Sequence, residues 1–163
     1  MTNREFFLHL CSDEYPRFLR ALEATPADQL EYRPHPHSRS AYELIGHLIG
    51  HEQDLLELVG TGSINHRIQV PFRDMEEAVS IYSTAHHALK PALSSLDESK
   101  WETIGAFSVQ GNLVMEAPHR ELAWMLLLDA IHHRGQLSTY LRPMGGTVPS
   151  IYGPSRDTMV VKA

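Results

Sequence analysis

One cysteine, Cys11, is present among the 163 residues of the chain, and this scarcity excludes two kinds of structure. A single thiol cannot form an internal disulfide, and it cannot supply a zinc site built from cysteines. No apolar run approaches the roughly 20 residues that a helix needs to span a bilayer. The first ten residues mix acidic and polar side chains with phenylalanines and lack the layout of a signal peptide. We therefore expect a cytoplasmic protein with no membrane partner.

Basic residues are in the minority, with 14 Lys and Arg against 20 Asp and Glu and a formal net charge of −6. Nucleic-acid binding depends on clustered cations that neutralise phosphates, so this balance argues against a nucleic-acid partner. Hydrophobic residues make up 42% of the sequence, which is enough to bury a core. The length suits a single domain over residues 1–163.

Several enzyme motifs are missing from the sequence. It has no glycine-rich phosphate loop, no Gly-x-Ser-x-Gly nucleophile turn and no His-Glu-x-x-His metalloprotease motif. Histidine is abundant, with 11 residues. The composition therefore directs the search for a functional site to the histidines and to carboxylates that could accompany them.

Proline and glycine divide the chain into helical segments and loops. The loops fall at 26–40, 60–71 and 105–118, and the segment after Pro143 is rich in turns. The spacing of apolar residues predicts helices over about 3–23, 39–59, 73–96 and 118–142.

Strand signals are weak by comparison. Only Ile104–Val114 could form a short hairpin. The helix signals include a capping-box pattern, formed by Ser40 and Glu43 at the start of the second predicted helix. Four long helices with little sheet predict an all-α protein, a four-helix bundle.

The last predicted helix carries a carboxylate and a histidine on its apolar face. At 100° per residue, Asp129 and His133 lie at the centre of a face that is otherwise mostly leucine and methionine. Their i, i+4 spacing lets both side chains reach one point. An ionised carboxylate in a bundle core is costly unless it is paired or binds a cation. This pair is therefore the most informative feature of the sequence.

The second predicted helix repeats the pattern with His47 and His51, again four residues apart and beside a stripe of leucines. Two imidazoles and one carboxylate that face one another across a bundle are typical ligands of a catalytic zinc or nickel site. Helical phase places His51 nearer the centre of the stripe and His47 about 40° toward its edge.

Structural interpretations of the same residues remain open. A histidine on an apolar face is more often a hydrogen-bonded core residue than a ligand, and Asp129 with His133 could be an ordinary buried pair. His132 points about 100° away from His133 and is not expected to be a ligand. Cys11 is expected to be a small core residue. A second apolar side of the last helix could lie in the core or at a subunit interface; it consists of Trp124, Leu128 and Ile131.

Several segments of the sequence carry a resemblance to a known family. They are Ile131–Leu137 (Ile-His-His-Arg-Gly-Gln-Leu), Leu141–Gly146, Val148–Ser155, and Glu43–Leu48 with Glu52 further on. With the helix layout along the whole chain, they resemble the DinB family. These DNA-damage-inducible four-helix proteins are related to thiol-dependent S-transferases.

The resemblance implies an up-down-down-up bundle, commonly a homodimer, with one divalent metal held by three histidines. By position, His47 is the ligand on the second helix and His133 the ligand on the last. The third family histidine falls on Asp129, so the implied metal site is His47, Asp129 and His133. A carboxylate can ligate zinc, nickel or manganese. His51 is kept as a substitute ligand or as a side chain that orients a ligand.

Two functions follow from these residues and from the resemblance. The first is a metal-dependent enzyme, a thiol transferase or hydrolase that acts on a small electrophilic molecule. A low-molecular-weight thiol as co-substrate would imply a role in detoxification or the stress response. The alternative is a non-catalytic dimeric bundle that binds a small ligand or a protein partner, with Asp129 and His133 as a structural pair. The sequence selects neither the substrate nor the metal, and it assigns no catalytic residue.

Overall fold

Capping residues fix the start of the first two long helices in the computed structural model, which describes residues 1–159. α1 (Asn3–Glu23) follows Thr2, and α2 (Ala41–Thr61) follows Ser40. Each of these two side chains accepts a hydrogen bond from a backbone N–H three residues later, and a glutamate at that position returns one. The capping box predicted at Ser40 and Glu43 is thereby confirmed.

The other helices also begin and end at recognisable signals. α3 (Met75–Ser95) follows Asp74, whose carboxylate accepts from the Glu77 N–H. α5 (His119–Leu141) follows Pro118, which ends the preceding strand. A single turn of helix, α4 (Glu98–Trp101), lies between them and was not expected. The four long helices lie within two residues of their predicted ranges, because caps and prolines are local signals.

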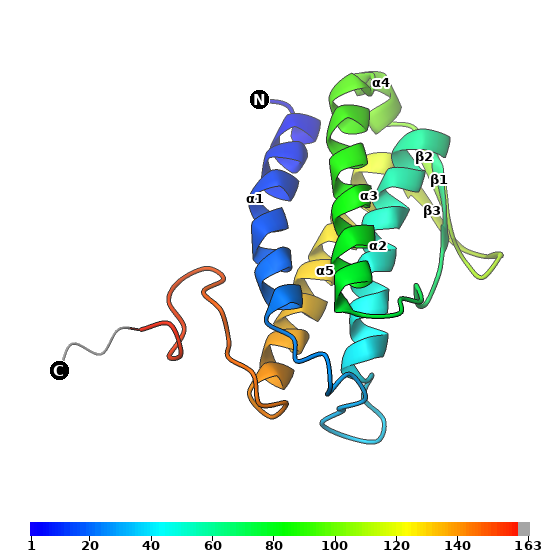
Figure 1. Ribbon diagram of the computed structural model, residues 1–163. Coiled ribbons are helices and arrows are strands. Elements are labelled where there is room, and N and C mark those ends of the chain that lie inside the picture. Colours follow the sequence, from blue (N-terminus) through cyan, green and yellow to red (C-terminus); the bar gives the residue numbers. More distant parts are fainter. Residues whose placement is uncertain (160–163) are drawn as a thin grey trace.

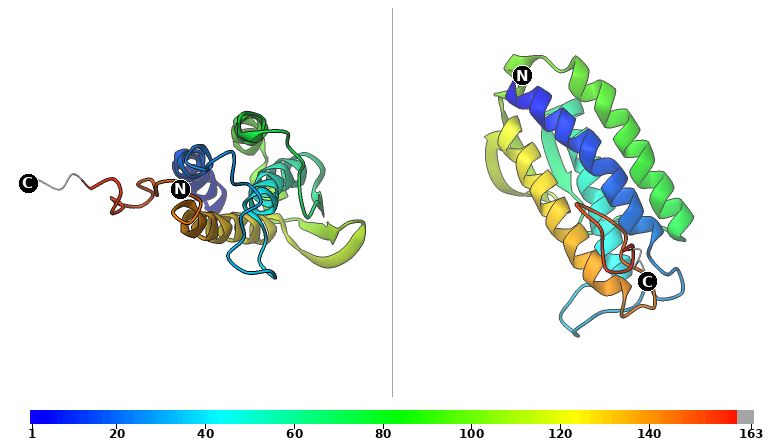
Figure 2. Two further views of the ribbon diagram at one scale, coloured as in Figure 1. Left: turned by 60° about the horizontal axis from the view of Figure 1, so that its bottom comes forward. Right: turned by 90° about the vertical axis from the view of Figure 1, so that its left-hand side faces the viewer.

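The long helices pack side by side. α2 packs against α3 and α5, and α1 packs against the same two helices from the other side. Figure 1 shows α1 and α5 running toward the lower end of the molecule, while α2 and α3 run toward the upper end. Viewed close to end-on, the four helices surround a common core (Figure 2, left).

Two clusters of buried apolar side chains fill the bundle. One gathers where α2 begins and α5 ends and includes Phe18, Leu44 and Leu137. The other gathers at the opposite end and includes Leu55 and Trp101. Removal of this surface from water is the main force that holds the helices together. His47, His51, Asp129 and His133 lie at the middle height of α2 and α5, between the two clusters.

A three-stranded sheet flanks the helices, so the expectation of an all-α protein is wrong in this respect. β1 (Ser63–His66) pairs in parallel with β2 (Ile104–Val109), which pairs in antiparallel fashion with β3 (Asn112–Pro118). The hairpin expected near Ile104–Val114 is present. β1 falls in the stretch that was expected to be a loop, because four residues show no period and their partner strand is distant in the chain.

Backbone geometry explains two glycines of this sheet. The β2–β3 turn has positive φ at Gln110 and Gly111, as a two-residue hairpin turn requires. At Gly105, a Cβ atom would lie 2.5 Å from the carbonyl oxygen of Gly62 and 2.8 Å from the ring of His119. Gly105 therefore allows the sheet to approach the start of α5 closely.

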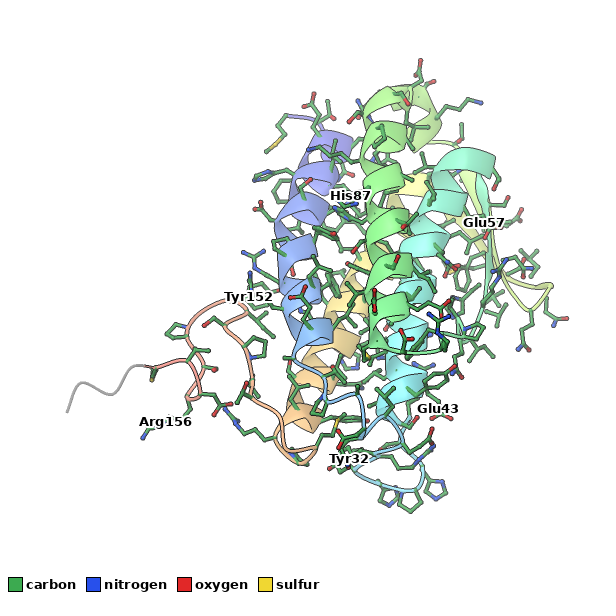
Figure 3. The ribbon with its side chains drawn as sticks, in the orientation of Figure 1. Tyr32, Glu43, Glu57, His87, Tyr152 and Arg156 are labelled. Carbon is green, nitrogen blue, oxygen red and sulfur yellow. The ribbon has the colours of Figure 1, made fainter. Side chains whose placement is uncertain are left out.

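The C-terminal segment contacts the bundle at a buried ion pair between α1 and α5. Arg134 on α5 is buried and donates to the Glu14 carboxylate on α1, and Tyr152 donates to the same carboxylate. Figure 3 shows Tyr152 on the tail beside α1. The tail thus contacts polar groups of the bundle interior. Among the described residues, no helix is long and apolar enough to cross a membrane.

Candidate metal centre

Three histidine side chains from α2 and α5 converge on one carboxylate oxygen, that of Asp129. Asp129 Oδ2 lies 2.9 Å from His51 Nε2, 3.2 Å from His133 Nε2 and 3.8 Å from His47 Nε2. One ligand atom of each residue lies within 4.8 Å of those of the others. Because residues four apart share a helix face, two i, i+4 pairs on packed helices suffice to build this cluster. The structure therefore brings all four sequence-predicted site residues together.

Hydrogen bonds fix the orientation of two of the imidazoles. His47 Nδ1 lies 3.1 Å from the carbonyl oxygen of Ile68, and His133 Nδ1 lies 2.8 Å from Gln136 Oε1. Both acceptors require the proton on Nδ1, which leaves a lone pair on each Nε2. Histidines that ligate metals usually donate their other N–H in this way.

His51 is the least satisfied polar side chain of the cluster. It is buried, and neither of its ring nitrogens has a hydrogen-bond partner of suitable geometry among residues 1–159. The Nε2 atom is close enough to Asp129 for a hydrogen bond, but the direction is poor. Buried polar groups of proteins normally find a partner, so this ring suits a site that receives a further ligand.

Asp129 lies at the rim of the cluster, contrary to the expectation that it is a core residue. Its side chain is 45% exposed, whereas those of His47 and His51 are 6% and 5% exposed. The carboxylate therefore keeps part of its hydration, and its burial costs less than the sequence suggested. The position leaves room on one side of the cluster for a ligand from solvent.

The electrostatics favour the protonation states that a metal needs. Burial, together with the charges of His51 and Arg39, lowers the pKa of His47 to about 3. Burial also lowers the pKa of His133. The adjacent His51 holds the pKa of the Asp129 carboxyl well below its usual range. At neutral pH, His47 and His133 are neutral and Asp129 is ionised, so lone pairs and a negative charge face one point.

The donor set fits a divalent transition metal. Tetrahedral zinc with ligand bonds of about 2.0–2.1 Å places its ligand atoms about 3.4 Å apart. The three distances to Asp129 Oδ2 bracket that value. Imidazole and carboxylate ligands suit zinc and nickel, and manganese accepts them as well.

A largely apolar cavity of about 610 Å³ opens beside this cluster. Its lining consists of His47, His51, His66, Phe107, Met125, Leu126, Leu128, Asp129 and His132. His132 is thus exposed at the cavity and is not one of the four clustered side chains. Leu128, expected at a subunit interface or in the core, is 57% exposed, whereas Trp124 and Ile131 pack partly against the core.

Sequence reasoning missed a second polar pair at the cavity, formed by Asp54 and His66. His66 Nδ1 lies 2.5 Å from Asp54 Oδ2, and both side chains are buried. With His51, they form a second group that could hold a metal. At 2.5 Å a proton lies between the two atoms, so this is a hydrogen-bonded pair. The contact of Asp54 with His66 depends on β1, a strand for which the sequence has no local signal.

Cys11 is buried, and burial raises the pKa of its thiol. It lies in the core cluster that contains Leu55 and Trp101, so the expectation of a core residue is confirmed. A thiol of this kind is a poor nucleophile. Any thiol chemistry at the cluster therefore requires a thiol from outside the chain.

The fold and the cluster define a helical bundle with an internal histidine–aspartate site, and the sequence assigns its class. The sequence profile of the DinB family matches residues 1–160, so the chain belongs to the DinB family. Among curated proteins, YrdA of Bacillus subtilis (strain 168) is 26% identical over 100 residues. That match spans 60% of this chain and 59% of YrdA.

Solved structures show the same fold. A DinB-like protein from Bacillus cereus has a TM-score of 0.73 at 20% identity, covering 91% of this chain and 97% of that one. A DinB-like protein from Bacillus subtilis has a TM-score of 0.68 at 18% identity, covering 94% and 99%. A mutant of the mycothiol-dependent maleylpyruvate isomerase has a TM-score of 0.56 at 14% identity. The match covers 89% of this chain and 62% of the isomerase. The mostly helical DinB-like fold is thereby established, with five helices and a small sheet within residues 1–159.

Proposed function

We propose that this protein is a metal-dependent enzyme that acts on a small electrophilic molecule, as a thiol transferase or a hydrolase. The observation that carries the proposal is the convergence of three Nε2 atoms on Asp129 Oδ2 at the wall of an apolar cavity. Structural metal sites are closed by protein ligands, whereas catalytic sites keep a position open. The exposed side of Asp129 provides that opening.

His47, Asp129 and His133 would hold the metal, with zinc or nickel favoured and manganese also suitable. His51 would either orient the Asp129 carboxylate, to which it is nearest, or serve as the substitute ligand. A divalent metal in such a site supplies Lewis acidity that favours the thiolate or hydroxide form of a nucleophile.

The other cavity residues have roles that follow from their own chemistry. Phe107, Met125 and Leu126 would bind the apolar part of a substrate and exclude water around it. His66 donates its Nδ1–H to Asp54, so its Nε2 is an acceptor for a hydrogen bond from a bound molecule.

The thiol half of the proposal is supported by one relative. The isomerase that shares this fold is mycothiol-dependent by name, and this chain spans 62% of its length. A low-molecular-weight thiol as co-substrate would place the protein in detoxification or the stress response.

We also propose an up-down-down-up four-helix domain over residues 1–163 that is cytoplasmic and homodimeric. Light scattering at micromolar concentration would test the dimer.

The first test is the metal content of protein purified without a histidine tag, measured by inductively coupled plasma mass spectrometry. We expect about one zinc, nickel or manganese ion per chain, and its loss in Asp129→Ala. Asp13→Ala, which removes an exposed carboxylate from α1, is the matched control and should keep the metal. Absence of metal even after reloading would refute the enzyme and favour the alternative, a non-catalytic bundle that binds a small ligand or a protein.

A further inference from the structure

Arg39 is a partly buried cation without a carboxylate partner. Its Nη1 lies 3.4 Å from His133 Nε2, and no Asp or Glu oxygen of the described residues lies within 4.0 Å of its guanidinium. Arg33, on the same loop, differs because it pairs with Glu43. A partly desolvated charge without a counter-ion carries an energetic cost that an anionic ligand would offset.

Contacts with two helices hold the backbone of Arg39 in place. Its carbonyl oxygen accepts a hydrogen bond from Tyr140 on α5 at 3.1 Å. The next residue, Ser40, is the buried N-cap of α2. The loop lies at the lower end of the bundle in Figure 1, and Figure 3 labels Tyr32 and Glu43 there. Since these contacts hold its backbone in place, Arg39 presents its charge with little loss of backbone entropy on binding.

Arg39 faces a second, more polar cavity, which reaches the cluster of His47, Asp129 and His133. This cavity, of about 580 Å³, has a lining of His37, Ser38, Arg39, His47, Asp129, His133, Gln136 and Tyr140. It shares His47 and Asp129 with the apolar cavity. A molecule that spans the cluster therefore meets a guanidinium at one end and Phe107, Met125 and Leu126 at the other.

The charge of Arg39 acts on the cluster itself. It contributes to the lowered pKa values of His47 and His133. The formal charges of Arg39 and Asp129, which line the same cavity without forming an ion pair, sum to zero, so a bound divalent cation would leave the site with a net positive charge. Such a site attracts anions. The lone pair on His133 Nε2 can bind either the Arg39 N–H or a metal ion, but not both. A metal bound to His133 would therefore leave the Arg39 N–H free to donate to a ligand.

We propose that Arg39 forms a carboxylate-binding subsite, so that the substrates are small molecules with a carboxylate at one end and an apolar group at the other. The planar guanidinium matches a carboxylate in geometry and charge. A monoanion fits better than a phosphate dianion, because one guanidinium faces a cavity that Asp129 also lines. That such molecules are substrates rests on the proposed function. That their carboxylate binds here depends on Arg39 alone.

The experiment compares hexanoate with its uncharged analogue hexanamide by NMR titration of the full chain, both metal-free and zinc-loaded. A charge-assisted hydrogen bond predicts about tenfold tighter binding of hexanoate. Arg39→Gln should reduce the preference to less than about twofold, and Arg39→Lys should retain part of it. Arg33→Gln is the matched control on the same loop and should keep the full preference.

Each outcome separates this subsite from the metal proposal. Equal binding of the two probes to the wild type, or a preference that survives Arg39→Gln, overturns the subsite. A preference found only in zinc-loaded protein and unchanged by Arg39→Gln places the carboxylate on the metal and also overturns it. An Arg39-dependent preference in protein that binds no zinc supports the subsite while the proposed enzyme fails.

Discussion

Asp54 and His66 join α2 to the small sheet through a buried hydrogen bond of 2.5 Å between Oδ2 and Nδ1. The bond sets the tautomer of His66, whose side chain lines the apolar cavity. It also attaches β1 to the helix that carries His47 and His51. β1, the strand that the sequence did not reveal, thus contributes His66 to the cavity wall.

Replacement of Asp54 by asparagine should weaken this attachment. The asparagine side chain would lose the charge-assisted bond in a buried setting, and we expect a loss of about 1–3 kcal/mol in the free energy of unfolding, measured by urea denaturation. Glu57→Gln is the matched control on the same helix, with an expected change within about 0.5 kcal/mol. Equal effects of the two substitutions would contradict a specific role for the pair.

Histidine substitutions should separate the metal ligands from their neighbours. We expect His47→Ala and His133→Ala to lose most of the bound metal, because each removes an oriented Nε2 donor. His132→Ala, at the cavity but outside the cluster, is the control and should keep it. Metal content would be measured by mass spectrometry, with the melting temperature as a second readout.

His51→Ala tests the remaining ambiguity of the second helix. If His51 orients Asp129, the variant should retain metal at reduced affinity, since Asp129 loses its nearest neighbour. If His51 is the ligand, its loss should abolish binding while His47→Ala leaves the site partly occupied. Competition titration against a chromogenic chelator distinguishes the two results.

The stability of metal-free protein should depend on pH between about 3 and 6.5. The pKa of His47 is near 3 in the folded state and near its ordinary value of 6.5 when unfolded, so the unfolded chain binds more protons in this window. The free energy of unfolding should therefore fall as the pH decreases, by up to about 1.4 kcal/mol per pH unit for each proton.

A matched pair of variants assigns this pH dependence. His47→Gln should flatten the slope, whereas His87→Gln, which removes an exposed histidine of α3 (Figure 3), should not. Urea denaturation at intervals of half a pH unit would measure both. A slope that is the same in wild type and His47→Gln would show that another group is responsible.

Arg134 should be essential to stability because its buried charge is paired with Glu14. Arg134→Met leaves the buried Glu14 carboxylate with the partly exposed Arg17 and the Tyr152 hydroxyl as its remaining partners, and we expect a loss of about 1–3 kcal/mol in the free energy of unfolding. The double variant Glu14→Gln, Arg134→Met should recover part of that loss, since no charged side chain then remains buried at this position. Arg120→Met, in an exposed pair with Glu102, is the control and should cost about 1 kcal/mol or less.

Local signals explain why the helices could be predicted. The Ser40 capping box, the residues around Pro118 and the apolar period all act within a few residues of one another. The spacing of His47 with His51, and of Asp129 with His133, is also local. These patterns were sufficient to select four residues that the structure places around a single point.

Long-range pairing explains what could not be predicted. β1 becomes a strand because it pairs with β2, about 40 residues later in the chain, and four residues carry no period of their own. Asp54 is buried only because that strand brings His66 to it. Likewise, Arg39 reaches His133 across 94 positions of sequence.

The sequence by itself determined the number and limits of the long helices and the pairs of ligand residues on two of them, since helix periodicity and caps are properties of neighbouring residues. Only the tertiary structure decided that Asp129 lies at a rim, that a sheet closes one side of the cavity and that Arg39 faces its polar side. Those features depend on the free energy of packing distant segments together, which no local pattern records.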